Sequence, residues 1–133
     1  MSIIRVDNFG PSAGGTTYSA RGIAKAWVNF NGTGTIAARD SENVSSLTDN
    51  GAGDYTVTFS NAFGAADEYN FSGGARLDSG AANEDFPIIG AARRTTYLAT
   101  SFRVVSVFRS SATTTATLQD PDIVAVTFHG DLA

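Results

Sequence analysis

The sequence predicts an all-β domain, and three observations support this fold class. Short runs of residues alternate between apolar and polar side chains, these runs are rich in β-branched and aromatic residues, and glycines stand between them. The turn signals recur about every 8–12 residues, which is typical of sandwiches and barrels. We therefore expect an antiparallel β-sandwich of roughly seven to nine strands, jelly-roll-like, with a short extended N-terminal arm.

Four segments show the alternation most clearly: residues 24–30, 55–60, 98–109 and 123–129. Three of them have one apolar face, which we expect to point into the core: Ala24, Ala26, Val28 and Phe30; Tyr55, Val57 and Phe59; Val124, Val126 and Phe128. The segment 98–109 is apolar on both faces, so we expect it to be covered on both sides. Weaker strands are predicted near residues 34–39, 44–48, 69–76 and 88–92. Glycines such as Gly73 and Gly74 are interpreted as turn residues between strands.

The chain divides into an N-terminal arm, residues 1–20, and a sandwich domain, residues 21–133. The arm carries three apolar anchors, Ile3, Ile4 and Val6, followed by a loop at residues 8–15. Each large apolar side chain left in water costs about 1.5–3 kcal/mol. We therefore expect the anchors to pack against another chain, with the arm adding a strand to a sheet edge of that chain. A disordered terminus is the alternative, because chain ends are commonly disordered.

The composition argues against several classes of protein. The formal net charge is −4, from nine basic and thirteen acidic residues, and Arg93-Arg94 is the only adjacent basic pair, so we expect no nucleic-acid partner. No apolar run approaches the ~20 residues of a membrane span, so we expect no membrane contact. The N-terminus lacks the apolar region of a secretory signal. The absence of cysteine excludes disulfides and thiolate metal sites.

The sequence carries no recognisable constellation for catalysis or metal binding. His129 is the only histidine, and a Ser-His-Asp mechanism would need a positioned nucleophile and acid beside it. Most carboxylates fall beside glycines or at predicted strand ends, where Asp favours turns. The loop from Asp49 to Asp54 is shorter than the about 12-residue calcium loop of an EF-hand and lacks its Glu. We therefore expect no enzymatic activity, no cofactor and no metal ion.

Three aromatic residues are candidates for contact with a ligand or a partner chain: Trp27, Tyr69 and Tyr97. Aromatic rings present a large apolar face on which a sugar ring can stack. Trp27 is the most informative of the three, because the alternation places it opposite the apolar face of its own strand. Packing within the core or an interface is the alternative for each residue.

The segment 22–59 contains unusual strings of residues. They are KAWVNFNGTG at 25–34, NVSS at 43–46, DNG at 49–51 and DYTV at 54–57. This segment resembles a domain that recurs in tail-fibre-like and receptor-binding proteins of tailed bacteriophages. The end of the last strand, residues 128–131, resembles the closing strand of such proteins more loosely, and residues 62–96 show no resemblance.

The resemblance implies a virion structural protein, made in the host cytoplasm, that serves as a tail-fibre or tail-tip component for receptor binding or adhesion. The alternative is a capsid decoration or head-fibre protein with a purely assembly role. A glycan-cleaving enzyme is disfavoured, because no paired acid and nucleophile can be identified. The implied partners are further copies of the chain, with a trimer favoured, other phage tail or capsid proteins, and a host cell-surface glycan. Apolar side chains on both faces of residues 102–108 also favour an interface.

Overall fold

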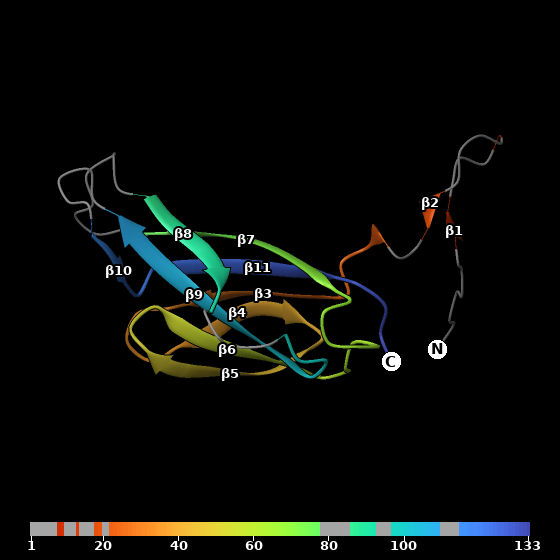
Figure 1. The fold of residues 1–133 in the computed structure, drawn as a ribbon, viewed down its shortest axis with the longest axis horizontal. Coiled ribbons are helices and arrows are strands. Elements are labelled where there is room, and N and C mark those ends of the chain that lie inside the picture. The colour runs from red at the N-terminus through yellow and green to blue at the C-terminus, as the bar shows by residue number, and fades with distance from the viewer. Residues whose placement is uncertain are drawn as a thin grey trace.

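The computed structural model describes residues 8–9, 13, 18–19, 22–77, 86–92, 97–109 and 115–133. In these residues two antiparallel sheets pack face to face, which confirms the predicted all-β sandwich (Figure 1). The four-stranded sheet contains β3 (Ala26–Asn31), β4 (Ala37–Glu42), β7 (Asn70–Arg76) and β11 (Ile123–His129). The five-stranded sheet contains β5 (Val44–Gly51), β6 (Asp54–Phe59), β8 (Phe86–Ala91), β9 (Ser101–Arg109) and β10 (Ala116–Leu118).

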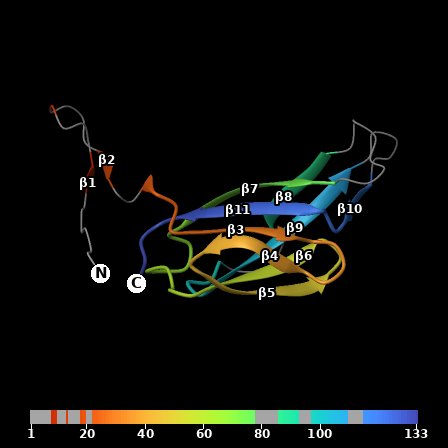
Figure 2. The ribbon, with the colours of Figure 1, turned by 180° about the vertical axis from the view of Figure 1, so that it is seen from behind.

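The first of these sheets has the strand order β4-β3-β11-β7. In the second, β5 pairs with β6, and β9 pairs with β6, β8 and β10. β6 and β10 share one edge of β9, because β8 occupies the other edge over residues 104–109. Ser106 marks the junction of β6 and β10: its N–H donates to Gly53 O at 2.7 Å, and its carbonyl accepts the Gln119 N–H at 3.3 Å. β7 and β8, from different sheets, lie side by side at one flank (Figure 2).

The predicted apolar faces form the core. On β3, β6 and β11, buried side chains alternate with half-buried ones in the register that the sequence predicts. Phe128 meets Phe59 and Phe102 edge to face, with ring centroids 5.0 Å and 5.3 Å apart. Phe63, in the connection between β6 and β7, is buried against them and stacks on Tyr69 at 4.5 Å. Burial of these inner faces decides which side chains of the same strands face solvent.

Tyr55 joins three parts of the chain at the opposite end of β6. Its ring is fully buried and meets Phe30 edge to face, with centroids 5.1 Å apart. Its hydroxyl lies 2.8 Å from Asp120 Oδ1 and 3.1 Å from Gly32 O, and Asp120 Oδ1 also accepts the Gly53 N–H at 2.6 Å. Burial, together with the neighbouring carboxylate of Asp120, raises the pKa of Tyr55. The hydroxyl therefore remains a hydrogen-bond donor throughout the neutral pH range.

Asn43 alone carries the chain from one sheet to the other, between β4 and β5. Its φ of 54° lies in the left-handed region, which Asn tolerates better than most residues. Its Oδ1 accepts the Asn61 N–H at 2.7 Å, its Nδ2 donates to Asn61 O at 3.1 Å, and its carbonyl accepts the Ser60 N–H at 3.2 Å. These bonds hold the corner against the end of β6.

Strand boundaries differ from the prediction where pairing, rather than side-chain pattern, determines the strand. β11 spans the predicted residues 123–129, whereas the strand predicted near residues 34–39 lies at β4, residues 37–42. β10 was not expected, because its three residues form a strand by pairing with β9. Gly73 and Gly74 lie inside β7 and not at a turn.

The N-terminal arm also differs from the expected loop at residues 8–15. β1 (Asn8–Phe9) pairs with β2 (Tyr18–Ser19) in an antiparallel two-stranded sheet. The anchors Ile3, Ile4 and Val6 lie outside the residues that the structure describes.

The expectation that segment 98–109 is covered on both sides is wrong at Leu98, which is 48% exposed, whereas Val105 and Val107 on the outer face of β9 are half-buried. Val107, on the outer face of β9, pairs with Ile88 of β8 on one side and with Leu118 of β10 on the other. Ile88 is 59% exposed and Leu118 is 47% exposed, so no described residue covers them. We call these three residues the apolar row.

Asp54 and Arg103 form an ion pair on the same outer face. Arg103 Nε donates to Asp54 Oδ1 at 2.7 Å, and Arg103 Nη2 donates to Asp54 Oδ2. The Asp54 side chain is 14% exposed and that of Arg103 is 39% exposed, so solvent screens part of the attraction. The hydrogen bond and positive charge of Arg103 lower the pKa of Asp54, despite its partial burial.

This ion pair predicts a pH dependence of stability. Because the pKa of Asp54 is lower in the folded than in the unfolded chain, its stabilisation is complete above the ordinary value of 3.8 and is lost as the pH falls through the folded value. We expect the free energy of unfolding of wild type to fall more steeply below about pH 4 than that of Asp54→Asn, by about 1 kcal/mol or less. Urea unfolding at several pH values measures this difference, and parallel curves would contradict it.

Candidate functional site

The outer face of the four-stranded sheet carries a groove of about 540 Å³, lined by residues 27–29 of β3, 125–127 of β11 and 72–74 of β7. We call it the Trp27 groove. Directly paired residues of antiparallel strands share a face of the sheet. The register sets Thr127 between Trp27 and Ser72, and Ala125 between Asn29 and Gly74. The exposed floor and walls therefore consist of two parallel rows of side chains.

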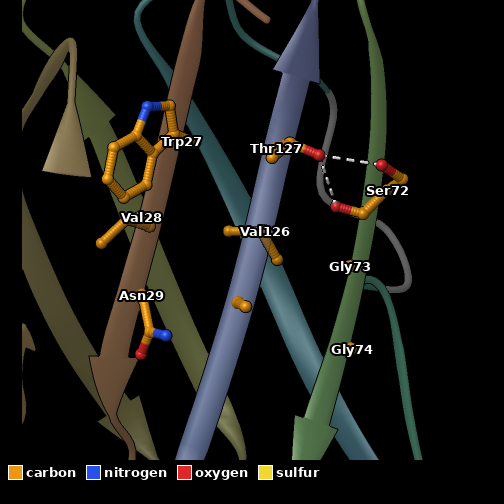
Figure 3. Close-up of a pocket in the computed structure, with 9 residues that line it drawn as sticks. Trp27, Val28, Asn29, Ser72, Gly73, Gly74, Val126 and Thr127 are labelled. Carbon is orange, nitrogen blue, oxygen red and sulfur yellow. Dashed lines mark hydrogen bonds between the residues drawn. The ribbon is translucent and has the colours of Figure 1, made fainter. Parts of the chain in front are cut away.

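Trp27 forms the β3 side of the groove. Its neighbours Ala26 and Val28 are buried in the core, so the intervening indole faces outward, as the alternation predicts. Figure 3 shows the indole on β3 and, across β11, Gly73 and Gly74 on β7. The half-buried indole lies on the side of β3 away from β11, and between β3 and β7 the outer face carries only short side chains and Gly74 (Figure 3).

The polar groups of the groove are hydroxyls and an amide. Ser72 Oγ and Thr127 Oγ1 lie 2.8 Å apart, and Thr127 Oγ1 also donates to Ser72 O at 3.4 Å (Figure 3). Asn29 Oδ1 accepts a hydrogen bond from Arg39 Nη1 at 3.4 Å, which leaves its Nδ2 as a donor for a ligand. None of the residues that line the groove carries a charge.

Charged side chains lie on β4, at the rim beyond Trp27. Glu42 pairs with Trp27, and Asp40 pairs with Asn29. Arg39 binds backbone carbonyls: Nη1 donates to Phe30 O at 3.0 Å, and Nη2 donates to Asp122 O at 2.7 Å. Charges of both signs therefore lie at this rim, because the Arg39 guanidinium also donates to the lining residue Asn29.

The two glycines of β7 have different structural environments. Gly73 faces inward, and a Cβ there would lie 2.6 Å from Ala125 O and 2.7 Å from Val126 Cγ1. Gly74 faces the groove, and a Cβ there would meet no atom within 4 Å. Its φ also lies outside the left-handed region. Packing therefore requires glycine at position 73, whereas neither packing nor backbone conformation requires it at position 74.

The structure brings Tyr69 and Tyr97 together, away from Trp27. Tyr69 is only 5% exposed, and its hydroxyl donates to Leu98 O at 3.1 Å. Tyr97 is half-buried and packs against Tyr69 and Phe102, with centroids 5.2 Å and 5.0 Å apart. Both rings border a small pocket of about 220 Å³ with Asp67 and Asn70. Burial raises the pKa of Tyr69, and its hydroxyl also lies 3.3 Å from Ser101 O, so it is satisfied by the turn between Leu98 and Ser101.

The groove residues Asn29, Ser72, Gly74 and Thr127 were not identified from the sequence as a site. Period-two alternation on residues 123–129 placed Thr127 on the outer face, but only the pairing of β7 with β11 brings Ser72 and Gly74 beside it. Because the glycines of β7 were interpreted as turn residues, they did not indicate a surface site. An outward glycine inside a strand is the sequence feature that would have pointed to this surface.

Other candidate chemistry is sparse in the described part of the chain. His129 Nδ1 lies 3.3 Å from Gly22 O. Among the described residues there is no group of three or more His, Cys, Asp or Glu arranged to hold a metal ion, and no helix long and apolar enough to cross a membrane. Residues 10–14, which read GPSAG, match the letters of the nucleophile pattern G-x-S-x-G but lie outside the described residues except for Ala13. That pattern acts at a strand-to-helix turn of an α/β-hydrolase, and the sandwich is a different fold.

Comparison with known proteins finds no matching family model, no matching curated protein and no matching solved structure.

The glycine pair of β7 predicts opposite effects for the same substitution. Gly73→Ala should lower the free energy of unfolding by about 1–3 kcal/mol, because the new methyl group overlaps Ala125 O and Val126. Gly74→Ala should raise it by up to about 1 kcal/mol, because alanine loses less backbone entropy on folding. Urea unfolding of both variants measures the difference, and equal changes would show that the two positions are not distinguished by packing.

Proposed function

We propose that the chain is a structural protein of a phage virion, a tail-fibre or tail-tip component that attaches the particle to the host cell surface. The observation that carries this proposal is the Trp27 groove, an aromatic and hydroxyl-lined surface on the outer face of a sheet whose inner face forms the core. Side chains on paired strands are held more firmly than side chains on loops, which suits a recognition surface.

The segment that resembles phage fibre domains supports the proposal by its position in the fold. Its first string, residues 25–34, includes β3 and supplies Trp27 and Asn29 to the groove. Its second begins at the Asn43 corner. Its third contains Asp49, whose Oδ1 accepts the Gly51 N–H at 2.9 Å and shapes the turn into β6. The unusual strings thus build the sheets and one side of the groove.

Competition for adsorption tests this function. Excess purified protein should slow the adsorption of the phage that encodes it to host cells, and antibodies against the chain should label the tail of the particle. Trp27→Ala should compete less well, whereas Leu132→Ala, at another partly exposed apolar position, should compete like wild type. Labelling of the virion without any competition would reject attachment and favour the purely assembly role.

A second candidate, a capsid decoration or head-fibre protein with an assembly role, is favoured by the apolar row. Ile88, Val107 and Leu118 lie side by side across three strands on the face opposite the Trp27 groove. Adjacent exposed apolar side chains are typical of an interface. We propose self-association through this row, and the resemblance favours a trimer. Both candidate functions are compatible with such an oligomer.

Substitution in the apolar row tests self-association. Ile88→Lys should convert the oligomer to monomers in light scattering, because a charge would be buried in the interface. Ile23→Lys is the matched control, since Ile23 is 49% exposed and lies outside the row, and it should leave the mass unchanged. A monomeric mass for wild type, or an unchanged mass for Ile88→Lys, would contradict an interface at this row.

A further inference from the structure

Gly74 is the residue from which this inference starts. Packing explains the glycine at position 73. At position 74, a side chain would meet nothing within 4 Å and would need no unusual backbone conformation. Glycine weakens a strand interior, and its presence there often marks a place where a ligand or another backbone approaches closely. A side chain at this position would project into the Trp27 groove.

We infer that the Trp27 groove binds a neutral pyranose unit of a polysaccharide, with the sugar ring over the open floor at Ala125 and Gly74 and with Trp27 at the β3 edge of the site. This inference names the ligand class of the attachment surface and rests on the proposed function. A pyranose has an apolar C–H face and a rim of hydroxyl groups. The groove offers matching partners, an aromatic face at Trp27 and the hydroxyl pair of Ser72 and Thr127.

The uncharged lining of the groove favours a neutral ligand. The lining residues are uncharged, and the β4 rim carries Asp40 and Glu42 in register with Asn29 and Trp27. Arg39 and Arg76 flank the groove on the same face, so charges of both signs surround the lining, and the lining itself offers no ion pair to a charged sugar. A cation stacked on the indole is the main rival, because tryptophan also attracts cations. A quaternary cation makes no hydrogen bonds to the hydroxyl and amide groups inside the groove, whereas a sugar uses them as hydrogen-bond partners.

The dimensions of the groove suit one or a few sugar units. Its volume of about 540 Å³ falls within the ~300–1,000 Å³ that is typical of small-molecule sites. From β3 across β11 to β7 the groove spans two strand spacings of about 4.8 Å each, which is close to the width of one or two sugar rings. A shallow site of this kind should bind a single sugar with a dissociation constant on the order of 1 mM.

The intrinsic fluorescence of the chain provides a direct test, because Trp27 is its only tryptophan. The full-length protein is titrated with the methyl glycosides of glucose, galactose, mannose and N-acetylglucosamine, and with tetramethylammonium as the cationic probe. We expect a saturable change in Trp27 emission with at least one glycoside. Gly74→Leu should weaken that response by about tenfold or more, because the new side chain fills the groove.

Gly90→Leu is the matched control. Gly90 lies in a strand of the other sheet and also has no atom within 4 Å of an added Cβ. It should therefore fold and respond to glycosides like wild type, and urea unfolding of both leucine variants confirms that they are folded. A response to tetramethylammonium alone, no response to any glycoside, or equal binding by Gly74→Leu and wild type would overturn the inference.

The adsorption assay separates failure of this inference from failure of the proposed function. If wild type and Gly74→Leu both compete with the phage and no glycoside changes the emission of Trp27, the attachment role stands and the saccharide site is wrong. If glycosides bind at Trp27 but the protein is absent from virions or does not compete, the saccharide site stands and the attachment role is wrong.

Discussion

The contact between Tyr55 and Phe30 sets the relation between the two sheets, because it joins β6 of one sheet to β3 of the other across the core. The rings meet edge to face, and the Tyr55 hydroxyl continues to Asp120, in the connection that leads to β11. Gly32 and Gly53 are needed beside it, since a Cβ at either position would lie within 2.6 Å of a neighbouring atom. The aromatic rings around Phe128 fill the other end of the core. Because side chains alternate along a strand, burial of one set of residues on β3 and β11 determines which residues face solvent.

The Trp27 groove is a consequence of this alternation of inward and outward side chains. Burial of Ala26, Val28 and Phe30 places Trp27 and Asn29 on the outer face, and burial of Val126 does the same for Ala125 and Thr127. A flat sheet surface becomes a groove only where side chains are missing, and Gly74 supplies that gap beside Ala125. The neighbouring glycine contributes differently, because Gly73 lets β7 approach Val126 and so fixes the position of the strand that carries Ser72 and Gly74. Gly73 thus serves packing, and Gly74 opens the surface to which we assign recognition.

Period-two alternation was sufficient to predict the sandwich, the core faces and the outward position of Trp27, because each depends on a local pattern within one strand. It was insufficient wherever a contact between distant segments decides the outcome. β10 is a strand because it continues the edge of β9 that β6 begins, and nothing in residues 116–118 alone indicates this. Tyr69 is buried by the rings of Phe102 and Phe128 from distant strands, so its exposure could not be judged from the sequence around it. The groove itself depends on the register of β7 with β11, which only the folded chain reveals.

The two outer faces of the sandwich are chemically different and lie on opposite sides of the core. This arrangement matters for the proposed assembly. The apolar row lies on the five-stranded sheet, whereas the Trp27 groove lies on the four-stranded sheet, on the other side of the core. Self-association through the apolar row would therefore leave every groove open to solvent. Linked copies of a weak site gain avidity of about 10²–10⁴ without any new contact, provided that the sites can engage together. A polysaccharide repeats the same sugar along its length, so it can meet this condition. A shallow groove of millimolar affinity would then be adequate for attachment.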